Sequence, residues 1–309
     1  MATGERAFTQ MLARFFAPRG RVRVPIGDDA ALVRNARGES LLCCDPVIEG
    51  VHFDAGTDLA LVGRKVVNRN LADIAAMGGV ADWLLVSLVL PKHLTDVQRM
   101  RLLRGIRSAA RAGGADVVGG DVAVGPGPLV VTVTAVGHCE GKVLRRSGAR
   151  PGDAIHVSAP LGGSLRSHHL RFEPPLRDGQ WLGRPKVPVT SAMDVSDGLL
   201  LDLQTLLTAS GGLGAEIFAD AVPVSRAARS IAKGDAEKAL QHALRDGEDH
   251  CLLFTVARGK RLPVGGPLSA RARRPIGRVL AQPGLWLVQP DGRRERVAAA
   301  GWEYELGTD

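Results

Sequence analysis

The chain has 309 residues, about twice the length of a usual single domain, so we expect either two domains or one large one. Its 45% hydrophobic and 23% charged residues exclude a disordered chain, and because aromatic residues supply only 4%, the cores must consist mainly of Leu, Val and Ala. The net charge of +8 comes from scattered Arg without interleaved aromatic residues, which argues against a nucleic-acid-binding protein.

The N-terminal segment predicts a helix rather than a signal peptide. Phe8, Met11, Leu12 and Phe15 share one helical face, and the segment lacks the apolar core of a secretion signal. No later apolar run reaches the roughly 20 residues of a membrane span. We therefore expect a cytoplasmic protein without a membrane partner.

Helices and strands alternate through the first half of the chain. We expect one helix from about Leu59 to Met77, where Gly78 and Gly79 form a glycine C-cap, and a second that Thr95 caps at its N-terminus. Short apolar or alternating runs predict strands at residues 40–45, 84–91, 115–121 and 129–137.

Residues 146–153, RSGARPGD, combine Arg, Gly and Pro without periodicity, which is typical of a domain junction. The second half then repeats the pattern of the first. Strands are expected in AIHVSA, GLGAEIFA and EDHCLLFTVA, and an amphipathic helix in MDVSDGLLLDLQTLLTAS. We expect domains at residues 1–145 and 146–309, of α/β and α+β architecture.

Short acidic segments stand beside glycine or at strand ends, where side chains from separate elements can converge. Clustered carboxylates repel one another unless a cation neutralises them, and their hard oxygen atoms suit Mg²⁺, which often accompanies phosphate. Adjacent glycines let backbone N–H groups approach that phosphate. Each segment alone also fits a turn or a helix cap; Ser196 and Asp197, for example, are candidates to cap the helix that begins near Leu199. The segments are Gly27-Asp28-Asp29, Cys44-Asp45, Asn70-x-x-Asp73, Gly119-Gly120-Asp121, Asp194-x-Ser196-Asp197-Gly198 and Gly247-Glu248-Asp249.

Several common phosphate-binding and catalytic motifs are absent from the sequence. It has no G-x-x-x-x-G-K-[ST], no H-R-D with D-F-G, no H-E-x-x-H and no G-x-S-x-G. Gly212 and Gly214 begin a G-x-G-x-x-G loop, but Ile217 stands at the position of its last glycine. A nucleotide site in this chain is therefore of another type.

Seven motifs, taken in order, resemble the thiamine-monophosphate kinase family of the aminoimidazole ribonucleotide synthetase-like superfamily: IGDDAALV, CDPVIEGVHF, NLADIAAMGG, VVGGDVAVGP, RRSGARPGD, MDVSDGLLLDL and GEDHCLLF. The resemblance spans nearly the whole chain. It implies a two-domain fold in which the N-terminal α/β domain forms a shared β-barrel in a homodimer and the C-terminal domain is α+β. It also implies an enzyme of thiamine biosynthesis, a phosphotransferase that phosphorylates thiamine monophosphate to thiamine diphosphate by direct in-line transfer from ATP.

Motif positions imply the site residues. The resemblance implies several Mg²⁺ ions, held by Asp28, Asp29, Cys43, Cys44, Asp45, Asp73, Asp121, Asp194 and Asp197. It implies contacts to the co-substrate ATP from Gly120, Asp121, Arg146 and Ser196. It implies contacts to thiamine monophosphate from His52, Glu248 and Trp302, with the indole packed on the thiamine rings. No residue is assigned as a catalytic acid or base, because a phosphate acceptor needs little help from a general base.

Departures from the family pattern bear mainly on the acceptor. Cys43 and Cys44 replace hydroxyl residues, and thiols are poor Mg²⁺ ligands. Ala72 replaces Ser, His250 replaces Tyr, and residues 158–162, SAPLG, replace a Thr-Gly-Thr-x-Gly segment. Two alternatives therefore stay open: a related enzyme that phosphorylates another small acceptor, and a non-catalytic nucleotide-binding homologue.

Three of the implied site residues also fit structural roles. His52 stands between two apolar residues and fits a partly buried structural histidine. Arg146 fits an anchor of the interdomain turn, and Trp302 fits a plug of a C-terminal core. The sequence alone does not decide between these roles and ligand binding.

Overall fold

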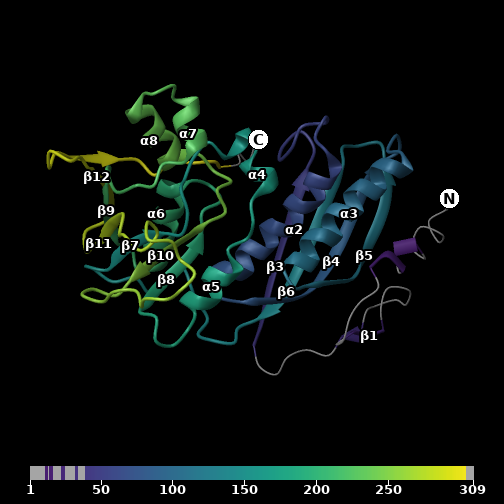
Figure 1. The fold of residues 1–309 in the computed structure, drawn as a ribbon, viewed down its shortest axis with the longest axis horizontal. Helices are drawn as coiled ribbons and strands as arrows, with labels where there is room; N and C mark the ends of the chain where they lie inside the picture. The colour runs from purple at the N-terminus through teal and green to yellow at the C-terminus, as the bar shows by residue number, and fades with distance from the viewer. Residues whose placement is uncertain (1–10, 13, 17–21, 25–31, 34–38, 304–309) are drawn as a thin grey trace, which may run out of the picture. The chain divides into compact units, whose positions relative to one another are not determined.

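The computed structural model describes residues 11–12, 14–16, 22–24, 32–33 and 39–303. Two compact units make up the chain (Figure 1): residues 1–74 with 79–140, and residues 75–78 with 141–309. The boundary expected between residues 145 and 146 falls inside the second unit. Both units combine helices with a sheet, in agreement with the predicted α/β and α+β class. Within the described part of the chain, none of the helices has the length and apolar character that a membrane crossing requires.

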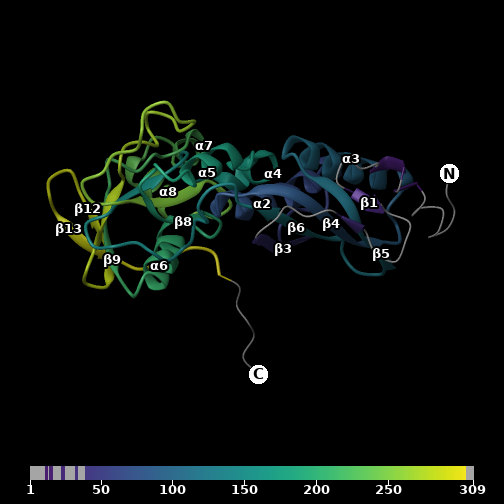
Figure 2. The ribbon, with the colours of Figure 1, turned by 90° about the horizontal axis from the view of Figure 1, so that it is seen from below.

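The first unit is a four-stranded sheet with two helices against one face (Figure 2). The strands lie in the order β3-β6-β4-β5, and the β4–β5 pair is parallel while the other two pairs are antiparallel. Their bounds are β3 (Ser40–Ile48), β4 (Val80–Pro91), β5 (Asp116–Gly125) and β6 (Val130–His138), and the helices are α2 (Leu59–Ala76) and α3 (Asp96–Ala112). A separate pair consists of β1 (Val22–Val24) and β2 (Leu32–Val33).

Helix boundaries in the first unit follow local chemistry. Thr95 caps α3 in a capping box with Gln98, since the Thr95 N–H donates to Gln98 Oε1 at 2.9 Å and the Gln98 N–H donates to Thr95 Oγ1 at 3.3 Å. Gly78, at φ +77°, follows the end of α2. The two helices cross closely at Gly63, because a Cβ there would lie 2.3 Å from the carbonyl oxygen of Leu102.

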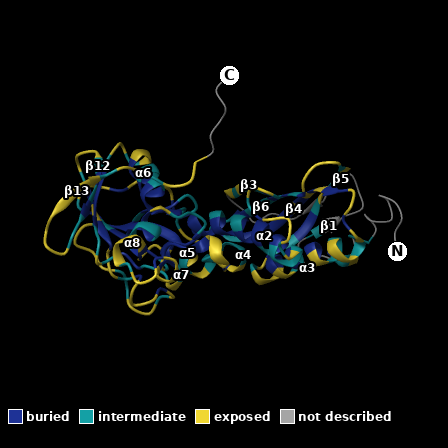
Figure 3. Ribbon diagram, turned by 90° about the horizontal axis from the view of Figure 1, so that it is seen from above, coloured by how far each residue is buried: buried dark blue, intermediate teal, exposed yellow. Residues whose placement is uncertain are grey.

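The second unit is built on a seven-stranded sheet in the order β13-β12-β9-β11-β7-β10-β8. Its strands are β7 (Ala154–Val157), β8 (Val189–Asp194), β9 (Gly214–Phe218), β10 (Leu252–Val256), β11 (Gly277–Leu280), β12 (Gly284–Val288) and β13 (Arg294–Val297). Its helical segments are η1 (Ser164–Arg166), α4 (His168–Arg171), α5 (Leu176–Leu182), α6 (Leu199–Ala209), α7 (Arg226–Ile231) and α8 (Ala236–Arg245). Leu203 and Leu207 of α6 are fully buried in the larger core of this unit. Figure 3 shows buried residues mainly in the strands, and exposed residues in the loops and on the outer side of helices such as α3.

The two long helices and the strands predicted from the sequence are present. The strand predicted at residues 84–91 begins earlier, at Val80. The sequence analysis did not predict α4, α5, α7, β11, β12 or β13, because these elements of four to seven residues lack a long enough run for a clear periodicity. It also missed α8, although Asp235 caps that helix at its N-terminus.

Candidate active site

Asp45 on β3 lies against α2 through a pair of backbone contacts. The Asp45 N–H donates to Asn70 Oδ1 at 3.0 Å, and Asn70 Nδ2 donates to the Asp45 carbonyl oxygen at 3.3 Å. Arg69 Nε lies 4.0 Å from Asp45 Oδ2. The NLAD segment on α2 therefore fixes the strand that bears one predicted metal ligand.

Cys43, Asp45 and Asp73 lie together on this side of the sheet. The Cys43 thiol donates to the Asn70 carbonyl oxygen at 3.3 Å. Burial raises the pKa of Cys43, and the negative charges of Asp73 and Asp45 raise it further. The structure thus brings together two of the predicted carboxylate ligands, and it keeps the neighbouring sulfur protonated.

Cys44 and Asp121 lie on the opposite face of the same sheet. Cys44 is exposed, and its sulfur accepts a hydrogen bond from Thr134 Oγ1 at 3.2 Å. Asp121 pairs with Ser87, in a row of paired residues that lies next to the row of Asp45 and two rows away from that of Cys44. Because adjacent rows point to opposite faces, Asp121 is separated from Asp45 by the sheet.

Gly120 is in the same row of the sheet as Asp45, and the structure has no room for a side chain at this position. Its φ is +150°, and a Cβ there would lie 1.8 Å from the Val86 carbonyl oxygen. The predicted ATP-contacting position is therefore restricted to glycine by the packing of β5 on β4.

Two other predicted residues take positions set by backbone contacts. His52 Nδ1 accepts a hydrogen bond from the Ile48 N–H at 3.1 Å, and the buried Lys65 ammonium donates to the His52 carbonyl oxygen at 2.8 Å. These contacts hold His52 in the turn after β3. Arg146 is exposed, and its carbonyl oxygen accepts from Ser210 Oγ at 3.2 Å. Asp28 and Asp29 lie outside the described residues.

The second unit gathers five predicted site residues around the turn between β8 and α6. Asp194 is the last residue of β8. The Glu248 N–H donates to the Ser196 carbonyl oxygen at 2.7 Å, and the Trp302 N–H donates to the Asp197 carbonyl oxygen at 2.8 Å. Trp302 is 57% exposed, so it does not plug a core.

The helix-cap alternative for Ser196 and Asp197 is wrong. The N-cap of α6 is Gly198, at φ +115°, and no side chain caps it there. The Asp202 carboxylate binds the turn before the helix, because its Oδ2 accepts from the N–H groups of Asp197 at 3.0 Å and Gly198 at 3.1 Å. Burial, followed by the charges of Asp197 and Asp194, raises the pKa of Asp202 to about 7. Asp202 therefore belongs to the acidic group at this turn, although the sequence did not single it out.

His250 joins two of these acids. Its Nε2 lies 3.2 Å from Glu248 Oε2 and its Nδ1 lies 3.5 Å from Asp194 Oδ2, and the ring stacks on Phe172 with centroids 4.3 Å apart. Complete burial acts to lower the pKa of His250, but the hydrogen bonds and charges of Asp194 and Glu248 raise it to about 9. In the metal-free chain, these two carboxylates therefore favour the protonated form of the imidazole. Sequence analysis noted this residue only as a departure from the family pattern.

Asp249 anchors the loop that bears Glu248. Both of its carboxylate oxygens accept from the Gly162 N–H at 3.0 Å, and Ser164 Oγ donates to one of them. Burial raises the pKa of Asp249 to about 7, and the bonds from Ser164 and Gly162 oppose that rise. Glu248 and His250, on either side, have φ of +65° and +47°. Such strained non-glycine backbone is concentrated at functional sites.

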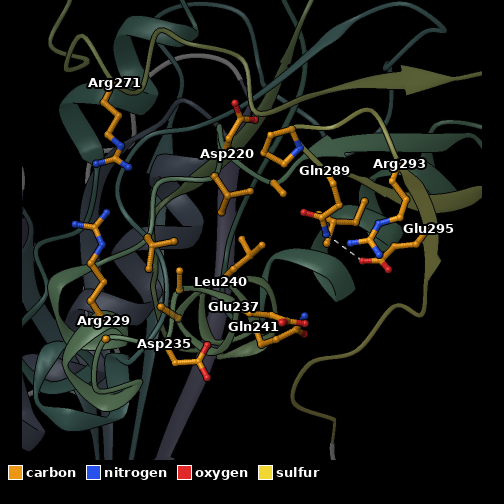
Figure 4. Close-up of a pocket in the computed structure, with 18 residues that line it drawn as sticks. Asp220, Arg229, Asp235, Glu237, Leu240, Gln241, Arg271, Gln289, Arg293 and Glu295 are labelled. Carbon is orange, nitrogen blue, oxygen red and sulfur yellow. Dashed lines mark hydrogen bonds between the residues drawn. The ribbon is translucent and has the colours of Figure 1, made fainter.

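A separate cavity of about 660 Å³ lies in the second unit, away from these residues (Figure 4). Residues of α7, α8, β12 and β13 line it, with Val222, Leu240 and Leu287 as part of an apolar floor and Arg229 and Arg271 among the charged residues. None of the predicted site residues lines it. The candidate site is therefore the β8–α6 turn rather than this cavity.

Comparisons with known proteins agree with the motif pattern. The family model described as AIR synthase related protein, N-terminal domain, matches residues 27–139. The thiamine-monophosphate kinase of Rhodopirellula baltica is 36% identical over 298 residues, which cover 92% of each chain.

Two solved structures are similar over nearly the full length. The crystal structure of thiamine-monophosphate kinase from Stenotrophomonas maltophilia K279a has a TM-score of 0.78 at 30% identity, covering 94% of this chain and 98% of that one. The structure of AaThiL complexed with AMPPCP and TMP has a TM-score of 0.76 at 28% identity, covering 97% and 96%. With its sequence, its fold and the order of its motifs in agreement, the chain belongs to the thiamine-monophosphate kinase family.

Proposed function

We propose that the chain catalyses the ATP-dependent phosphorylation of thiamine monophosphate to thiamine diphosphate by direct in-line phosphoryl transfer. The observation that supports this most strongly is the assembly of Asp194, Ser196, Asp197, Glu248 and Trp302 around one turn of the second unit. The motif resemblance implies that these residues contact the metal, the nucleotide and the acceptor. Their backbone contacts hold them together, although they come from three separate parts of the sequence.

Phosphoryl transfer between two phosphates depends more on neutralising and aligning the two anions than on a general base. The donor and the acceptor are both anionic phosphates, and an acceptor phosphate already has a nucleophilic oxygen atom. The side chains at the turn are acidic and so bind a phosphate only with a cation between them. For this reason we assign no catalytic acid or base.

The donor set fits Mg²⁺ in part. Asp45 and Asp73 present hard oxygen atoms on one side of the first sheet, and Asp194 and Asp197 do so in the second unit. The Cys43 thiol fits poorly because its pKa is raised, and Cys44 lies with Asp121 on the other face of the sheet.

Among the described residues, no three His, Cys, Asp or Glu side chains are placed to hold one ion. We therefore propose separate ions at Asp45–Asp73, at Asp121 and at Asp194–Asp197, with Asp28 and Asp29 as further ligands. Magnesium, when bound, supplies the positive charge that neutralises the phosphates. Gly120, Asp121, Arg146 and Ser196 are the proposed ATP contacts, and His52, Glu248 and Trp302 are the proposed acceptor contacts.

A homodimer is part of the proposal. The face of the first sheet that turns away from α2 and α3 exposes apolar side chains, with Leu42 at 71%, Leu85 at 41% and Val89 at 37%. An apolar sheet face of this kind is stabilised when a second surface covers it. We propose that the same face of a second copy covers it, as in the shared barrel that the family resemblance implies.

One assay tests the function. Purified protein is incubated with Mg-ATP and thiamine monophosphate, and thiamine diphosphate is quantified against reactions with thiamine or other phosphorylated acceptors. We expect thiamine diphosphate and ADP in equal amounts. ADP formed only with another acceptor would identify the related enzyme, and nucleotide binding without any ADP would identify the non-catalytic homologue.

A further inference from the structure

The contact between His250 and Glu248 suggests how the acceptor site obtains its geometry. We propose that His250 is a positioning residue that holds the Glu248 carboxylate in the orientation that binds the cationic thiamine part of the acceptor. This inference rests on the proposed function. It adds a residue at which the sequence departs from the Tyr of the family pattern.

The imidazole is fixed on both edges and on one face. Nε2 meets Glu248 at 3.2 Å, Nδ1 meets Asp194 at 3.5 Å, and Phe172 stacks on the ring at an interplanar angle of 22°. The side chain of His250 is only 3% exposed. The ring therefore cannot turn away from Glu248 without breaking contacts with all three neighbours.

Glu248 is held but remains accessible. Its side chain is 19% exposed, whereas that of His250 is buried. Its backbone N–H is bound to the Ser196 carbonyl oxygen, and the next residue, Asp249, is bound to Gly162. These contacts fix the Cα of Glu248, and the contact with His250 Nε2 holds its carboxylate. A carboxylate that is oriented before binding loses less side-chain entropy when a cation or an amine reaches it.

Three substitutions at His250 separate this role from simple packing. His250→Phe keeps the ring and its stacking on Phe172 but removes both nitrogen atoms. His250→Gln replaces the donor near Nε2, which faces Glu248, and His250→Asn replaces the donor near Nδ1, which faces Asp194. We expect the KM for thiamine monophosphate at saturating Mg-ATP to rise about tenfold in the Phe and Asn variants. In the Gln variant we expect it to stay within about threefold of the unmodified chain.

A double-mutant cycle with Glu248→Gln provides a second test, which remains informative even if the His250 variants are less stable than the unmodified chain. If His250 acts through Glu248, His250→Phe raises the KM much less in the Glu248→Gln background than in the unmodified chain. His156→Phe is the matched control, because His156 is also buried and also stacks on a Phe, at 5.3 Å from Phe254, but its Nδ1 meets the Ala272 carbonyl oxygen. We expect that variant to leave the KM unchanged.

The outcomes distinguish the inference from the proposed function. Equal rises in KM for Phe, Asn and Gln, or the same factor for His250→Phe in both backgrounds, would overturn the positioning role while the unmodified chain still forms thiamine diphosphate. If the unmodified chain forms no thiamine diphosphate, the proposed function is wrong and the inference is wrong with it.

Discussion

The Trp302 N–H donates a 2.8 Å hydrogen bond to the carbonyl oxygen of Asp197, so the end of the described chain is tied to the turn between β8 and α6. Gly301 permits this approach, because a Cβ there would lie 2.2 Å from that same oxygen atom. Trp302 as a whole is 57% exposed. An exposed aromatic ring anchored by its own backbone next to an acidic turn is well placed to bind a ligand.

Trp302→Ala should weaken acceptor binding without unfolding the protein. Because the ring is mostly exposed, we expect a loss of at most about 0.5 kcal/mol in the free energy of unfolding. The KM for thiamine monophosphate should rise about tenfold, and Trp302→Phe should recover most of the loss. A thermal melt and steady-state kinetics on the same preparations test this. A large drop in melting temperature with an unchanged KM would restore the structural role.

Asp73→Asn and Asp121→Asn should remove activity and leave stability intact. Each substitution keeps the side-chain shape but removes a negative charge, so the metal-free protein should be no less stable, and reduced repulsion with Asp45 should favour the Asp73 variant. Turnover should fall by orders of magnitude, with a shift to higher magnesium. A melt in EDTA and a magnesium titration of turnover measure the two effects.

Asp116→Asn is the control for Asp121, since both residues lie on β5. We expect the control variant to retain full turnover. Full activity at ordinary magnesium in the Asp73 and Asp121 variants would instead remove the metal assignment of both residues.

The two adjacent cysteines should differ in reactivity. Cys44 is exposed on the open face of the sheet, whereas Cys43 is bonded to Asn70 and its pKa is raised by burial and by Asp73 and Asp45. Because the thiolate is the reactive form, iodoacetamide should modify Cys44 well before Cys43 in protein diluted until the proposed dimer has dissociated. Peptide mass spectrometry over a time course measures the order. Faster labelling of Cys43 would contradict the assigned strand orientation.

A variant with both Cys43→Thr and Cys44→Thr should keep or raise activity, because a hydroxyl oxygen is a harder Mg²⁺ donor than a thiol.

Asp249 should make the protein less stable as the pH rises. Its pKa is about 7 in the folded chain and near 4 when unfolded, so between these values the folded state binds more protons. The free energy of unfolding should therefore fall as the pH increases from about 4 to about 7, by up to about 4 kcal/mol from this residue. Above about pH 7 the contribution should level off.

Asp249→Asn tests this dependence, because Asn does not titrate and keeps one oxygen atom for the Gly162 N–H. Urea unfolding in EDTA across the same pH range should give a shallower slope for the variant, whatever its absolute stability. Asp202, whose pKa is also raised to about 7, contributes to the slope that remains. An identical slope in the variant and the unmodified chain would show that Asp249 does not titrate there.

Local patterns in the sequence determined much of the architecture. The Thr95–Gln98 capping box sets the start of α3, and Gly78 follows the end of α2. The alternation of apolar and polar residues in β6 is visible within the strand's own sequence. These features depend on contacts within a few residues, so the sequence contains all the information needed to predict them. The order of the acidic motifs likewise sufficed to indicate a family and its candidate site residues.

Only the tertiary structure decided which residues meet. Register in the first sheet separates Asp121 and Cys44 from Asp45 and Cys43, and a shift of one residue would have reversed those faces. Asp202 binds the N–H of Asp197 in the turn before α6, and His250 reaches both Glu248 and Asp194 because β8 pairs with β10. Each of these contacts depends on the packing of elements that are far apart in the chain, and hydrophobic periodicity specifies which face of an element is buried but not which neighbour it meets.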